Sequence, residues 1–99
     1  GKTIAVSAVS AAATTVVKVT SQHGAVGTWL EGEVDPGPKQ AAVPPGEVWA
    51  LDFFSHFTPA GSIVYRVVES RPGSPPAVFT ETRQGAAGQT TVFRHIVFG

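Results

Sequence analysis

Asp52, Ser55 and His56 lie close together in the sequence and are the residue types of an acid, a nucleophile and a base. In an extended strand their spacing does not suit that chemistry. Residues four apart are separated by about 13 Å, so Asp52 cannot orient His56, and Ser55 faces the other side of the strand. The sequence therefore predicts no catalytic triad, and we expect a protein that is not an enzyme.

Metal chemistry has equally little support. The chain contains no cysteine, which excludes both disulfides and thiolate zinc sites. The three histidines, His23, His56 and His95, have no ligand spacing, although they and an aspartate would suit zinc if they converged. We expect no metal and no cofactor, with His56 and His95 partly buried and hydrogen-bonded and His23 exposed.

Glu31 and Glu33 lie on either side of Gly32, just after Trp29. Paired carboxylates beside an aromatic ring are the groups that glycosidases use, but on one flat strand they would lie about 7 Å apart without a cleft. The simpler interpretation makes them solvent-facing, paired with Arg66 or Arg94. Trp29 and Glu31 remain candidate contacts for a bound sugar.

The elements that position these residues are strands. Valine occurs fifteen times and threonine ten times, and both favour a pleated sheet. Clusters of glycine and proline recur every 8–12 residues, which is typical of a sandwich or barrel. We expect one domain, residues 1–99, folded as an all-β antiparallel β-sandwich of seven or eight strands, either Ig-like or jelly-roll-like. The expected strands are 3–10, 14–21, 26–34, 47–57, 62–69, 77–83 and 90–98, with a short eighth at 39–43.

Period-two alternation assigns the side chains of these strands to faces. It places Phe54 on the outward face of strand 47–57, whereas Trp49 lies on the other face of that strand. It places Trp29 outward as well. A register shifted by one residue would instead turn both rings inward. Strand 90–98 is apolar on both sides, with Val92, Ile96 and Phe98 on one side and Phe93 and Val97 on the other. In so small a domain, two-sided apolar strands favour cover by another subunit.

The low content of charged residues also favours a surface covered by another protein. Charged residues make up 14% of the chain, against about 25% on average. The net charge is zero and the basic residues are scattered, which disfavours nucleic acid and anionic membranes as partners. Residues 1–13 resemble a signal peptide only faintly, because two serines interrupt the apolar run. A protein partner is expected; the alternative is a low-charge protein without an interface.

The segment Val43-Pro44-Pro45-Gly46-Glu47-Val48-Trp49 resembles a turn that leads into a long apolar strand in tailed-phage virion proteins. The turn Thr58–Gly61 and the strand containing Val64-Tyr65-Arg66-Val67 are similar to a second stretch of those proteins. The resemblance covers about a quarter of the chain. It implies a structural part of a virion, such as head decoration, fibre or spike, and a location on the virion or extracellular surface. It carries over no functional residues.

Together these features predict a non-enzymatic structural module that docks on or builds a larger protein array, such as a phage capsid decoration or appendage, by self-association or on a protein lattice. The alternative is a carbohydrate-binding or surface-adhesion module that uses Trp29 and Glu31. The environment of Trp29 discriminates between the two. The candidate interface residues are Trp29, Phe54, Phe93 and Phe98.

Overall fold

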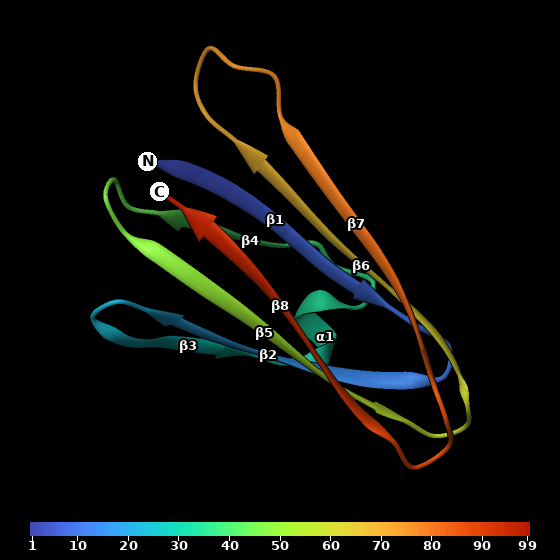
Figure 1. Ribbon diagram of the computed structural model, residues 1–99. Coiled ribbons are helices and arrows are strands. Elements are labelled where there is room, and N and C mark those ends of the chain that lie inside the picture. Colours follow the sequence, from blue (N-terminus) through green and yellow to red (C-terminus); the bar gives the residue numbers. More distant parts are fainter.

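Turn residues divide the chain into eight runs rich in β-branched and aromatic residues. Each run forms a strand in the computed structural model, which describes residues 1–99 (Figure 1). One four-residue helix interrupts them. The elements are β1 (Lys2–Val9), β2 (Ala13–Ser21), β3 (Gly24–Trp29), α1 (Glu31–Val34), β4 (Lys39–Val43), β5 (Val48–Phe57), β6 (Gly61–Ser70), β7 (Ala77–Gly85) and β8 (Thr90–Phe98).

The strands form two four-stranded antiparallel sheets that pack face to face, which confirms the expected β-sandwich. Sheet A has the order β4-β1-β6-β7, and sheet B has the order β3-β2-β5-β8. The chain passes from one sheet to the other at every connection except β2–β3 and β6–β7. This strand order could not be read from the spacing of turns, because spacing does not say which strands become neighbours. No helix has the length and apolar character to span a membrane.

Alternation along the strands builds the core. The residues of β5 and β6 alternate between buried and more exposed positions along nearly their full length. Phe53 of β5 and Tyr65 of β6 meet between the sheets with ring centroids 4.9 Å apart. The buried apolar cluster is Ile4, Val6, Ala8, Ala13, Val17, Val19, Trp29, Val34, Val43, Trp49, Leu51, Phe53, Phe57, Ile63, Tyr65, Val67 and Val97.

The expected turn before β5 is present. The backbone N–H of Glu47 donates to the carbonyl of Pro44 at 3.1 Å, and Gly46 has φ of 79°, a conformation that favours glycine. Trp49, three residues after that glycine, is buried, and its indole N–H donates to Glu47 at 2.9 Å. The turn thus fixes where β5 enters the core.

The prediction of one strand across 26–34 is wrong in two respects. The strand ends at Trp29, and residues 31–34 form α1, where the backbone N–H of Leu30 donates to the side chain of Glu33 at 2.9 Å. The pairing of β2 with β3 also shifts between Val19 and Thr20. Such an irregularity reverses the alternation beyond it, so Trp29 points inward and is 8% exposed.

The two long sides of the sandwich differ. On one side α1 connects β3 to β4, contacts β1 and β2, and buries Val34 completely. On the other side the edge strands β7 and β8 have no such cover. Figure 1 shows β7 and β8 diverging from the turn that joins them. We call this second side the open side; it exposes side chains that face the space between the sheets.

Candidate functional site

The residues considered for catalysis occupy separate environments. Ser55 is fully buried, and its hydroxyl is hydrogen-bonded to Thr15 and to Tyr65. Asp52 and His56 lie on the opposite, outer face of β5. Asp52 is bound by Arg94, and Nδ1 of His56 lies 2.9 Å from the hydroxyl of Thr90. The buried hydroxyl therefore has no base and no access for a substrate.

The two glutamates lie on α1 rather than on a strand. Glu33 pairs with Lys39 at 3.2 Å, not with Arg66 or Arg94 as expected. The hydrogen bonds from the Leu30 backbone and the Lys39 side chain lower the pKa of Glu33. Because Trp29 is buried in the core, its ring is not available for stacking on a sugar beside Glu31. The prediction that Trp29 is an outward-facing contact is wrong.

The histidines do not meet. His23 and His56 are exposed, whereas His95 is partly buried, so the expectation of a partly buried His56 is also wrong. No group of three or more His, Cys, Asp or Glu side chains is placed to hold a metal ion.

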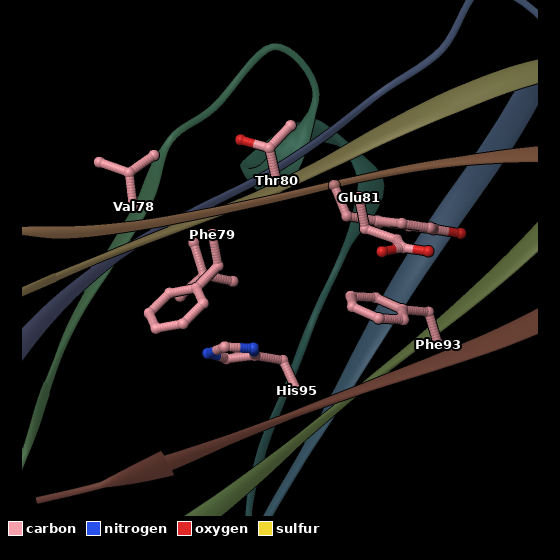
Figure 2. Close-up of a pocket in the computed structure, with 8 residues that line it drawn as sticks. Val78, Phe79, Thr80, Glu81, Phe93 and His95 are labelled. Carbon is pink, nitrogen blue, oxygen red and sulfur yellow. The ribbon is translucent and has the colours of Figure 1, made fainter.

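An open groove of about 340 Å³ lies between the edge strands β7 and β8 on the open side. Figure 2 shows Phe79, Phe93 and His95 facing this space, while Val78 and Thr80 point away from it. The groove exists because β7 pairs only with β6 and β8 pairs only with β5, so neither edge is bridged. Its lining is Tyr65, Val67, Val78, Phe79, Thr80, Glu81, Phe93 and His95.

Aromatic rings form the walls of the groove. The ring of Phe79 lies 4.7 Å from that of His95, measured between centroids. Phe93 stacks on Tyr65 at 5.1 Å, and Tyr65 in turn contacts Phe53 of the core. Phe79 remains 45% exposed although it faces the space between the sheets. An inward-facing phenyl ring with nearly half its surface in water is an incomplete part of the core.

A buried carboxylate supports His95 from behind. The side chain of Glu69 lies between Lys2 and His95, with nitrogen–oxygen distances of 2.7 Å to each. Burial alone raises the pKa of Glu69, but hydrogen bonds from Lys2 and His95 outweigh it and hold the pKa below its ordinary value. Glu69 is therefore ionised near neutral pH and fixes the orientation of the His95 ring.

Charged residues line the rim of the groove. Glu81 and Arg83 are two apart on β7 and form an ion pair at 3.0 Å. The guanidinium of Arg83 also lies over the ring of Phe93, 5.1 Å from its centroid. Both side chains follow the face of β7 that carries Phe79, because residues two apart in a strand point the same way. The rim thus presents one positive and one negative charge side by side.

Phe54 and Phe98 lie on a different surface, the outer face of sheet B. There Asp52 receives two hydrogen bonds from Arg94, at 2.7 and 2.9 Å. The opposite neighbour of Asp52 is Lys18, which lies over the Phe54 ring at 5.2 Å. Beyond this charged row, Phe98 is 61% exposed. This face carries apolar rows on both sides of a row of paired charges.

Of the four candidate interface residues, the structure brings only Phe93 into the groove. Phe54 and Phe98 share the outer face of sheet B, and Trp29 is in the core. The residue that sequence reasoning missed is Phe79. Its strand carries Phe79, Glu81 and Arg83 on one face, and no role was assigned to that face from the sequence. Inward-facing charges are, however, a usual feature of edge strands, which was the available signal.

Comparison with known proteins gives no relative from which a role could be transferred: no family model, no curated protein and no solved structure matches this chain.

Proposed function

We propose that this domain is a non-enzymatic structural module that docks on or builds a larger protein array by covering its open side. The observation that carries the proposal is the exposure of Phe79, an inward-facing ring that the domain's own strands leave 45% uncovered. A partner that fills the groove completes the core at this point. Each square ångström of apolar surface removed from water contributes about 25 cal/mol.

The composition of the groove fits protein better than a small polar ligand. Three aromatic rings and Val67 line it, and its polar side chains are already paired: His95 with Glu69, and Glu81 with Arg83. Aromatic side chains gathered beside a polar rim are characteristic of protein interfaces. Carbohydrate binding would depend on an exposed Trp29 ring, and Trp29 is buried.

The wider setting follows from the resemblance to tailed-phage virion proteins. A capsid decoration or appendage would place many copies of such a module side by side, on a virion or extracellular surface. A poorly charged surface suits that situation, because neighbouring protein covers much of it.

Light scattering behind a sizing column tests the proposal. The chain concentration is varied from about 1 to 500 µM, a range that brackets the dissociation constants of weak interfaces. We expect a mass above the 10.2 kDa of one chain that rises with concentration. Phe79→Ser should weaken this association, because it removes the exposed ring from the groove. Leu30→Ser, a change at an equally exposed apolar side chain between β3 and α1 and away from the open side, is the matched control. A 10.2 kDa monomer at every concentration would contradict assembly by this chain.

A further inference from the structure

We propose that the occupant of the open side is a second copy of this chain, whose β7 pairs antiparallel with β7 along their free edges. This inference rests on the proposed function and specifies the partner and the register. Strand β7 is bonded to β6 on one side only, so a row of its backbone N–H and C=O groups is unpaired. At nine residues it is long enough to act as a template for another strand.

The sequence of β7 complements itself in one register. Directly opposed residues of an antiparallel pair point to the same face, so inward residues must oppose inward residues. A twofold axis at Thr82 places Glu81 of each copy opposite Arg83 of the other. It also places Phe79 opposite Gly85 and Thr80 opposite Gln84. Two intermolecular ion pairs then extend the Glu81–Arg83 pair that each copy already contains.

The neighbouring registers lack this complementarity. An axis at Glu81 places the two Glu81 carboxylates opposite each other, and an axis at Arg83 does the same for the two guanidinium groups. An axis at Thr80 places Glu81 opposite the ring of Phe79. Like charges directly opposite are destabilising, so charge selects the axis at Thr82.

Pairing in this register also covers the groove. Phe79 of one copy would lie over Gly85 of the other, where the ring of Phe57 fills the space that a side chain would take. The two grooves then face each other across the axis, and sheet A continues as eight strands from one copy to the other. The contact is the same patch on both copies, which is the arrangement of a closed dimer.

Charge exchange tests the register. Glu81→Arg and Arg83→Glu each place like charges opposite one another, so we expect the dimer dissociation constant to rise about tenfold or more. The double variant Glu81→Arg/Arg83→Glu restores both opposite-charge pairs and should recover the wild-type constant. Circular dichroism of each variant checks the fold. If the single variants associate as the wild type does, or the double variant does not recover, the register is wrong.

Cross-linking provides an independent measurement, because the chain has no cysteine of its own. At the axis the two Thr82 Cα atoms would lie about 4.5–5.5 Å apart, within the range of a disulfide. Thr82→Cys should therefore give a covalent dimer on oxidation. In this register the Thr80 Cα atoms of the two copies lie about 13 Å apart along the strands, so Thr80→Cys should stay monomeric on a denaturing gel.

The outcomes separate the two proposals. Association that is insensitive to the charge variants, or that cross-links at position 80 but not 82, overturns the β7 pairing and leaves the assembly function standing. A wild-type chain that is monomeric at every concentration, with no cross-link at position 82, overturns the β7 pairing and also the self-assembly by which the proposed function builds an array.

Discussion

The carboxylate of Glu69, on sheet A, lies 2.7 Å from Nε2 of His95, on sheet B. This contact joins the sheets beside the groove, and Lys2 binds the second carboxylate oxygen at 2.7 Å. Because the pKa of Glu69 is lower in the folded chain than its ordinary value of 4.5, the unfolded chain takes up its proton first as the pH falls. The stability that this group contributes is present above pH 4.5 and is lost as the pH falls through its folded pKa.

We therefore expect the unfolding free energy of the wild type to fall more steeply than that of Glu69→Gln as the pH is lowered below 4.5. Urea unfolding at several pH values measures both. Glu31→Gln is the control, because Glu31 lies on α1 and takes part in none of the ion pairs. Parallel pH curves for the wild type and Glu69→Gln would show that the contact contributes no acid-sensitive stability.

Trp29 and Phe98 provide a direct test of which aromatic residues belong to the core. Trp29 is 8% exposed and Phe98 is 61% exposed. Trp29→Ala should lower the unfolding free energy by about 3–5 kcal/mol, because it leaves a cavity. Phe98→Ala should change it by no more than about 0.5 kcal/mol in the monomer. Denaturant unfolding at low protein concentration distinguishes them, and equal effects would contradict the inward placement of Trp29.

Ser55 links two other hydroxyls in the middle of the core, those of Thr15 and Tyr65. Ser55→Ala deprives both of a buried partner and should cost about 1–3 kcal/mol of unfolding free energy. Ser62→Ala is the matched control, because Ser62 is exposed on β6. Were the two serine variants equally stable, the buried hydroxyl chain would have no energetic role.

Gly85, at the end of β7, lies directly against Phe57. A Cβ atom added there would overlap the buried Phe57 ring, so Gly85→Ala should destabilise the fold by about 1–3 kcal/mol. Gly27→Ala, on β3, meets no atom within 4 Å and should be close to neutral. Thermal unfolding of both variants checks the difference; a neutral Gly85→Ala would mean that β7 can move away from Phe57 at little cost.

The sequence was sufficient for most of the fold, because alternating apolar residues and glycine–proline turns carry most of the information about strands. It failed at residues 30–34, where Glu31, Gly32, Glu33 and Val34 alternate as a strand does. The hydrogen bond from the Leu30 backbone to Glu33, which begins α1, depends on local geometry that periodicity does not express. The outward placement of Trp29 failed for a related reason, since β3 has an extra residue, Val26, opposite the step from Val19 to Thr20, and uninterrupted alternation does not allow for it.

The candidate site was harder to predict. Phe93 was identified because its strand is apolar on both faces. Phe79 was missed because a groove between β7 and β8 depends on which strands end the two sheets, and turn spacing contains no record of strand order. The acid–histidine contact at the groove was likewise invisible, since Glu69 and His95 lie on strands that do not pair with each other.

The helix that closes the β3–β4 side sets the number of neighbours that one molecule can accept. With α1 occupying that side, the domain has a single unfilled side, and a contact made there with a second copy leaves no further side of the same kind. Growth through this contact stops at two molecules. An extended array would need a second, different contact, for which the outer face of sheet B offers the exposed ring of Phe98. The domain would then be bivalent: one contact, along β7, would form dimers, and the other, on the outer face of sheet B, would join one dimer to the next.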